Sequence, residues 1–226
     1  MNLLKSSLLL AKKDLFSEWK TKQVLVTQII FASLVIVVFS FAFDPSNNMT
    51  KAVIPGIIWV IIVFAGVLGL NRSIVSEQRN ETLHALLVAP MAPAGIFLGK
   101  FLSNFTMIII VEIIAIPFLF LLFDFNMAGS IPYFILIIFV GSFGFVSIGT
   151  FLAALAGNSK SSEMLLPLLL FPIASPVLIG VTQATRIILS DMSKLSSALA
   201  WTQMVASYDV IFFVISLFLI DYVLEV

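Results

Sequence analysis

Cysteine is absent from this sequence, and histidine occurs once, at His84. Without cysteine, the chain cannot form a disulfide, a thiolate metal site or a covalent attachment through sulfur. With a single histidine, it cannot build a multi-histidine metal or haem site by itself. We therefore expect no metal site and no cofactor bound by this chain alone. The sequence also lacks the GxxxxGK[ST] phosphate loop, which excludes ATP binding of that kind.

Charge is scarce as well. Only 11% of the 226 residues are charged and 61% are hydrophobic, with a formal net charge of zero. Soluble domains are typically about 25% charged and about 45–50% apolar. The composition therefore predicts an integral membrane protein, and the zero net charge gives no electrostatic case for binding nucleic acid.

Six stretches are apolar enough to cross a bilayer, which takes roughly 20 residues per helix. We predict an all-α membrane protein, a single transmembrane domain over residues 1–226, with spans at about 24–43, 54–70, 101–123, 132–156, 164–185 and 208–224. The fourth is rich in small residues, which favour close helix packing. The fifth is expected to kink or break at its prolines. The sixth is the weakest, with Asp209 and Asp221 expected at the two membrane interfaces.

Six spans place both termini on one side of the membrane, and the lysine and arginine count indicates which side. One set of segments holds nine: Lys5, Lys12, Lys13, Lys20, Lys22, Arg72, Arg79, Lys100 and Lys160. The other set holds three: Lys51, Arg186 and Lys194. We therefore expect both termini in the cytoplasm.

Residues 1–22 predict an amphipathic helix before the first span. Its apolar stripe follows helical spacing and consists of Leu4, Leu8, Ala11, Leu15 and Trp19, with lysines around it. Such a helix lies in the membrane interface; the alternative is a basic leader that only sets topology. The short apolar run and the following Lys12 and Lys13 do not fit a signal peptide, so the N-terminus is expected to be retained.

A polar segment interrupts the hydrophobic body between the second and third spans. Residues 71–80 read NRSIVSEQRN, and a short apolar helix-like stretch follows before Pro90, Pro93 and Gly95, which are expected to end any helix. A short cytoplasmic helix here could place apolar residues in a partner's groove while its charges set the register. The alternative is a polar loop whose leucines rest on the membrane. The interface residues of the first hypothesis are Glu77, Arg79, Glu81, Leu83, His84, Leu86 and Leu87.

The order of these features resembles the membrane subunit of an ABC-2-type exporter, and more narrowly the CcmB family, haem exporter protein B of cytochrome c maturation. The resemblance covers essentially the whole chain. It rests on Lys13-Asp14-Leu15, Pro55-Gly56-Ile57-Ile58-Trp59, Glu81-Thr82-Leu83, Leu86-Leu87-Val88-Ala89-Pro90, Leu98-Gly99-Lys100 and Leu166-Pro167-Leu168-Leu169-Leu170-Phe171-Pro172.

The resemblance implies a non-catalytic permease of the cytoplasmic (inner) membrane. ATP would be hydrolysed by a separate, CcmA-like ABC subunit that docks on a coupling helix over Glu77–Leu87, within the cytoplasmic segment 71–95. It also implies a second copy of this chain, haem-handling membrane subunits similar to CcmC and CcmD, and haem as cargo of the complex.

Two further residues are functional candidates. Glu112 lies midway along the third span, where a charge costs about 2.5–3.5 kcal/mol on insertion scales, so it should face the protein interior or be protonated. It is a polar site on a transport path or at a subunit interface, or else a carboxyl satisfied by neighbouring helices. His84 invites a haem-ligand interpretation, but its cytoplasmic position beside leucines favours a protein interface.

Other functions remain open from the residues. They are an ABC-2-type exporter of another cargo, such as a drug or a lipid-linked sugar, and a membrane scaffold without an ATPase. An intramembrane enzyme is disfavoured, because Glu112 is the only acid placed at mid-span and such sites need clustered groups. The outer segment Ile187–Ser207 predicts a short interfacial helix with Trp201 and Tyr208 in the aromatic belt.

Overall fold

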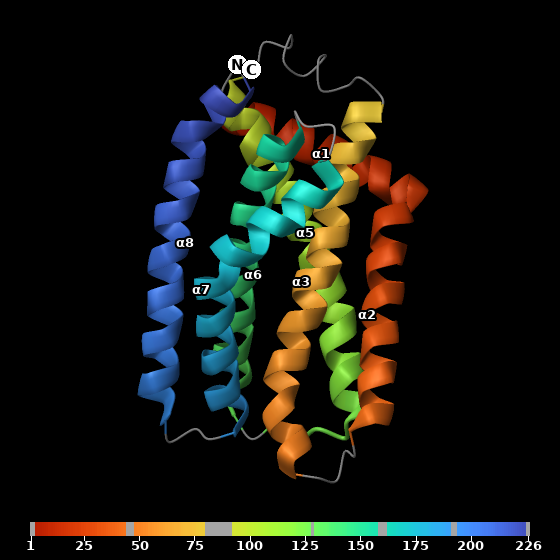
Figure 1. Ribbon diagram of the computed structural model, residues 1–226, viewed down its shortest axis with the longest axis vertical. Helices are drawn as coiled ribbons and strands as arrows, with labels where there is room; N and C mark the ends of the chain where they lie inside the picture. The colour runs from red at the N-terminus through yellow and green to blue at the C-terminus, as the bar shows by residue number, and fades with distance from the viewer. Residues whose placement is uncertain are drawn as a thin grey trace.

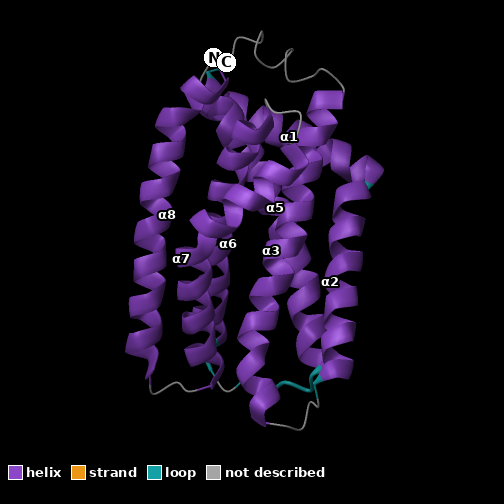
Figure 2. Cartoon of the chain, viewed as in Figure 1, coloured by secondary structure: helices purple, strands orange, loops and turns teal. Residues whose placement is uncertain are grey.

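The computed structural model describes residues 3–43, 48–79, 92–127, 129–157, 162–190 and 194–224. Within these ranges the chain is helical, with no strand (Figure 2). The helices are α1 (Leu3–Thr21), α2 (Gln23–Ala42), α3 (Asn48–Arg79), α5 (Pro93–Leu122), α6 (Ile131–Gly157), α7 (Ser162–Ser190) and α8 (Leu195–Leu224). The all-α prediction is confirmed.

Six of these helices are long and apolar enough to cross a membrane, as the sequence predicted. They run side by side along the long axis of the molecule, whereas α1 lies across one end of the bundle (Figure 1). The same end, called the α1 end below, holds the end of α3, the start of α5 and the end of α8 (Figure 1). The protein is therefore a multi-pass helical membrane protein with one additional N-terminal helix.

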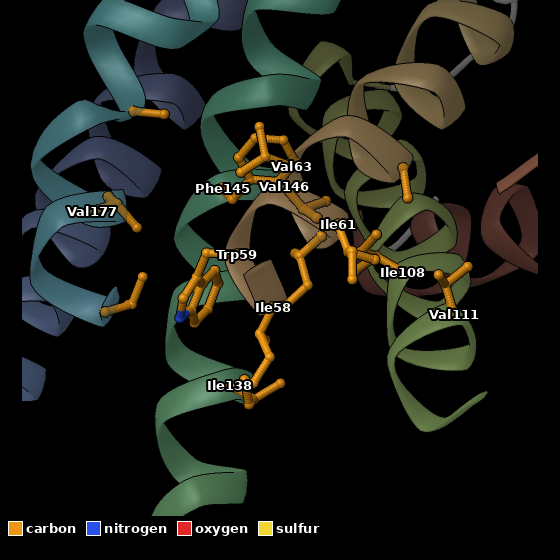
Figure 3. Packing of buried hydrophobic residues seen from close by; sticks show 14 of the residues in the cluster. Ile58, Trp59, Ile61, Val63, Ile108, Val111, Ile138, Phe145, Val146 and Val177 are labelled. Carbon is orange, nitrogen blue, oxygen red and sulfur yellow. The ribbon is translucent and has the colours of Figure 1, made fainter. Parts of the chain in front are cut away.

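Helices α3 and α6 form the centre of the bundle. Within each of their spanning segments, 72% of the residues are buried, against 17–33% in the other four. Trp59 of α3 lies between these helices, close to Ile58 and Ile138 (Figure 3), and its Nε1 donates a hydrogen bond of 3.0 Å to Thr185 Oγ1 of α7. The small residues predicted to allow close packing do so here, since a methyl group at Gly141 would clash with the Trp59 ring.

Helix α7 continues through all three of its prolines, Pro167, Pro172 and Pro176. It changes direction along its length, as Figure 1 shows, so the prolines bend the helix without interrupting it. Pro176 has no N–H to donate to the carbonyl of Pro172, and the Ser175 hydroxyl donates to that carbonyl instead, at 2.8 Å. The Tyr208 hydroxyl of α8 donates to the neighbouring Ile173 carbonyl, also at 2.8 Å.

Helix α8 begins at Leu195, well before the expected start of the sixth span at Tyr208. The predicted interfacial helix over 187–207 was wrong: the described part of that segment is the end of α7 and the first turns of α8. Its polar residues are compatible with a helix because their hydroxyls bond back to the preceding turn. Thr202 Oγ1 donates to the Ala198 carbonyl, and Ser207 Oγ to the Gln203 carbonyl, both at 2.9 Å.

Candidate functional site

Helices α3 and α5, which come before and after the undescribed part of the predicted coupling segment in the sequence, both reach the α1 end (Figure 1). Helix α3 continues through Asn71 to Arg79, beyond its candidate span of Ala52–Arg72, and Glu77 and Arg79 belong to its last turn. Glu81, Leu83, His84, Leu86 and Leu87 lie outside the described residues. Pro93 was expected to end a helix, but it begins α5 instead, because the first turn of a helix does not need the N–H that proline lacks.

Helix α1 is amphipathic, as predicted, but most of its apolar stripe does not face the bundle. Leu4, Leu8 and Trp19 of the stripe are exposed by 61–73%, whereas Ala11 is buried together with Ser6, Ser7 and Leu10. An outward stripe of this kind is suited to the membrane interface, as expected for such a helix.

The buried face of α1 is packed closely against the first turns of α5. A Cβ added at Gly99 would lie 2.9 Å from the Leu10 Cβ and 3.0 Å from the Ser7 carbonyl oxygen. Lys100 Nζ then forms an ion pair of 2.7 Å with Asp14 Oδ2, in which both side chains are largely buried. Helix α1 is thereby fixed to the part of α5 that directly follows the predicted coupling segment.

The turn from α1 into α2 is held by a carboxylate. Lys22 adopts a left-handed conformation, with φ of 52°, at the turn where the chain passes from α1 into α2. Glu18 Oε1 accepts hydrogen bonds from the backbone N–H groups of Val24 at 2.7 Å and Leu25 at 3.0 Å. These bonds satisfy two of the free donors at the start of α2, so the angle between the two helices is well defined.

Behind this turn lies a pocket of about 440 Å³, called the α1 pocket below. It is formed by the second half of α1, the start of α2, the second half of α3, the first half of α5 and Val146 of α6. Its lining includes charged residues, amides and apolar side chains: Lys13, Asp14, Ser17, Glu18, Thr21, Gln23, Val24, Gln28, Gly66, Gly69, Leu70, Arg72, Lys100, Ser103, Asn104, Met107, Ile108 and Val146.

Glu112 faces the protein interior. The sequence had left open whether it would face inward or be protonated. It is 4% exposed on α5, and its carboxylate accepts a hydrogen bond from the Ser142 hydroxyl of α6. The adjoining cavity, of about 10 Å³, is lined otherwise by aliphatic side chains and holds at most about one water. The geometry therefore makes Glu112 a polar contact between α5 and α6.

Asp209 is a second buried acid, and sequence reasoning misplaced it at the membrane interface. It lies in the middle of α8 and is 2% exposed, because α8 begins so much earlier than expected. Its carboxylate rests on Gly144 of α6, where any side chain would overlap it. Both carboxylate oxygens are buried and have no hydrogen-bond partner among the described residues. The signal that could have identified it is a lone acid within an uninterrupted run of helix-forming residues from Leu195.

Basic residues gather at the α1 end. The described residues at or near that end include Lys5, Lys12, Lys13, Lys20, Lys22, Arg72 and Lys100, whereas Lys51, Arg186 and Lys194 belong to helix ends at the opposite end. In the described part of the chain, no three histidine, cysteine, aspartate or glutamate residues lie close enough to hold a metal ion.

These features define a class: a polytopic helical membrane protein with a basic interfacial helix, a polar segment between its second and third spans, and isolated acids inside the bundle. The chain belongs to the CcmB family, since the family model described as CcmB protein matches residues 5–226. The family resemblance seen in the sequence is thereby confirmed.

Individual relatives carry the same name at modest identity. Heme exporter protein B of Pseudomonas aeruginosa is 27% identical over 164 residues, covering 71% of this chain and 73% of that protein. Heme exporter protein B of Bradyrhizobium diazoefficiens is 26% identical over 168 residues, covering 73% and 74%. Heme exporter protein B of Rhodobacter capsulatus is 25% identical over 156 residues, covering 69% and 71%.

Proposed function

We propose that this chain is the permease subunit of an ABC-type transporter that exports or handles haem for c-type cytochrome biogenesis. The observation that carries the proposal is the CcmB family match over residues 5–226, on a chain with six long apolar helices. The cargo is inferred from the names of its relatives, which are heme exporter proteins. Haem is cargo of the assembly here, and ATP is bound and hydrolysed by a separate subunit.

The energy of ATP hydrolysis enters through residues 77–87. The ATP-binding subunit docks on this segment, with Glu77, Arg79 and Glu81 setting the register and Leu83, His84, Leu86 and Leu87 forming the apolar contact. Two helices receive the displacement directly, since α3 ends at Arg79 and α5 begins at Pro93.

The contacts of α5 determine what moves with it. Its first turns are attached to α1 by the close contact at Gly99 and by the Lys100–Asp14 ion pair. Its middle is joined to α6 through the Glu112–Ser142 hydrogen bond. A push on the coupling segment would therefore move the interfacial helix and the centre of the bundle together.

The α1 end faces the cytoplasm in this proposal, and the membrane is the cytoplasmic (inner) membrane. The excess of basic residues at that end supports this orientation. The complex contains two copies of this chain, since two ATP-binding domains act as a pair, and haem-handling membrane subunits similar to CcmC and CcmD.

The test is affinity purification of the tagged chain from membranes of its native host. Recovery of an ATP-binding subunit together with a haem-binding membrane protein is expected. Recovery of an ATP-binding subunit whose ATPase activity responds to drugs, without any haem protein, would instead indicate an exporter of another cargo. If neither an ATP-binding subunit nor a haem-binding protein co-purifies, the result would contradict the proposal and favour a membrane scaffold.

A further inference from the structure

The α1 pocket combines a charged mouth with an apolar floor. The exposed residues Lys13 and Arg72 and the half-buried Glu18 line its mouth. Its apolar lining consists of the buried residues Leu70, Ile108 and Val146 and the half-buried Met107. Its volume of about 440 Å³ falls within the roughly 300–1,000 Å³ of small-molecule sites. A lining that changes from charged to apolar with depth suits an amphiphilic ligand.

Among the described residues, the charges of the mouth leave one cation, Arg72, without an acidic partner. Asp14 is paired with both Lys13, at 2.9 Å, and Lys100, at 2.7 Å. Glu18 accepts the backbone N–H groups at the start of α2. In the described part of the chain, Arg72 donates its hydrogen bonds to uncharged groups: Gln23 Oε1 at 2.9 Å and Thr27 Oγ1 at 3.3 Å. These bonds orient the Arg72 guanidinium and leave its charge for an anion.

A buried acceptor lines the same pocket. Gln28 is 2% exposed, and its Nε2 donates to the Ala65 carbonyl at 2.8 Å. Its Oε1 is buried and has no hydrogen-bond partner among the described residues. A buried carbonyl oxygen without a donor is unfavourable, because it has lost its hydrogen bonds to water without replacement. A hydroxyl donor on a bound molecule, or a water accompanying it, would satisfy this oxygen.

Close helix contacts hold the walls of the α1 pocket in place around the Gln28 amide. A methyl group at Gly69 would overlap the Gln28 side chain, and one at Gly66 would overlap the Phe145 ring. The cavity therefore depends on two glycines of α3, one turn apart, that let α2 and α6 approach closely.

We propose that the α1 pocket binds an anionic amphiphile, with Arg72 contacting the phosphate or carboxylate of its head group and the apolar floor receiving its hydrophobic body. Two molecules supply this chemistry. An acidic phospholipid such as phosphatidylglycerol carries a phosphate and hydroxyl donors, and haem carries two carboxylates on an apolar ring. The first would make the pocket a lipid site. The second would make it a cargo site, an outcome that rests on the proposed function.

The experiment measures binding by the full chain reconstituted in phosphatidylcholine nanodiscs. Phosphatidylglycerol retention is followed by native mass spectrometry, and haem binding by its absorption spectrum. The Arg72→Gln variant keeps hydrogen-bonding capacity but removes the charge. It should weaken binding of the true ligand about tenfold, the scale of one hydrogen bond to a charged group.

The matched control is Lys12→Gln. Lys12 is exposed on α1 and does not line the α1 pocket, so this variant removes the same charge from the same end of the bundle. It should bind as the unmodified chain does. Weakening by Arg72→Gln but not Lys12→Gln supports the pocket, and whether the affected ligand is phosphatidylglycerol or haem identifies the source.

A second variant tests the floor independently of charge. Met107→Trp places a larger side chain on the apolar lining and should also reduce binding, with thermal melting confirming that each variant is folded. Equal binding by the unmodified chain, Arg72→Gln and Met107→Trp would overturn the proposal, as would binding of neither molecule. Because no ATP-binding subunit is present, these outcomes are separate from the test of the proposed function.

Discussion

Glu112 places a carboxyl group at the centre of α5, where its only described hydrogen bond comes from Ser142 on α6. Glutamine keeps an acceptor at the same position, so Glu112→Gln should fold normally and support c-type cytochrome formation in the native host. Glu112→Leu leaves the buried Ser142 hydroxyl without this partner, which should destabilise the bundle by about 1–3 kcal/mol. Thermal melting in detergent, alongside cytochrome c levels, measures both effects.

A different result for Glu112→Gln would assign Glu112 a functional role in place of a structural one. If Glu112→Gln melted as the unmodified chain does but abolished cytochrome c formation, the charge itself would be required, and Glu112 would belong to the transport path. Normal melting of Glu112→Leu would show that the contact contributes little to the α5–α6 packing.

Asp209 and Gly144 form the other buried polar contact, between α8 and α6. Gly144→Ala forces a methyl group into the space of the Asp209 carboxylate, and overpacking of this kind typically costs about 1–3 kcal/mol. Adding Asp209→Ala removes the overlapping group and should restore most of the lost stability. The measurement is a double-mutant cycle by thermal melting in detergent.

Gly56→Ala is the matched control for this cycle, since no described side chain or other helix comes within 4 Å of a Cβ at Gly56 beyond its immediate chain neighbours. It makes the same chemical change within a helix and should melt at or above the temperature of the unmodified chain. Additive effects of Gly144→Ala and Asp209→Ala would contradict the contact between the two residues.

The two acids show what the sequence could predict at this scale. Glu112 stood out because it is a lone charge inside an uncharged run, and its inward orientation followed from the cost of exposing it to lipid. Asp209 was misplaced because its depth depends on where its helix begins. The serines, threonine and glutamine before it were assigned to a separate interfacial helix, whereas the hydroxyls of Thr202 and Ser207 bond back to the preceding turn and one helix runs on from Leu195.

Among the elements, the α1–α5 contact depends on the smallest side chains. Gly99→Ala would place a methyl group 2.9 Å from the Leu10 Cβ, which is rigidly attached to the α1 backbone, so the two helices must separate. We expect a loss of about 1–3 kcal/mol and faster amide hydrogen exchange in α1.

Gly95→Ala is the control in the same contact. A Cβ there meets its nearest neighbours at 3.7–4.0 Å, an ordinary van der Waals distance, so the exchange of α1 should not change. If the two variants exchanged equally, the close approach at Gly99 would not be what holds α1 in place.

The elements themselves were largely predictable, because length and hydropathy decide whether a helix can cross a bilayer. Contacts between elements were not. Nothing in the amphipathic pattern of residues 1–22 indicates that the face with Ser6, Ser7, Leu10 and Ala11 is buried while Leu4, Leu8 and Trp19 of the apolar stripe are exposed. Pro93 was also ambiguous, since a proline both ends one helix and begins the next.

At the scale of the whole molecule, the proposed orientation can be tested by labelling, since the absence of native cysteine makes any introduced cysteine unique. Lys12 and Asn126 are exposed at opposite ends of the bundle. In intact spheroplasts, a membrane-impermeant maleimide should label Asn126→Cys, and should label Lys12→Cys only after permeabilisation. The reverse pattern would invert the topology and place the coupling segment outside.

The central claim is that residues 77–87 are the surface on which an ATP-binding subunit acts. Its most direct test is site-specific crosslinking in native membranes from a photoactivatable maleimide placed at Leu86→Cys, with Asn126→Cys as the control at the opposite end. We predict a crosslink between Leu86→Cys and an ATP-binding subunit, with none from Asn126→Cys. Failure of Leu86→Cys to crosslink, in membranes where the two proteins still purify together, would contradict docking at this segment.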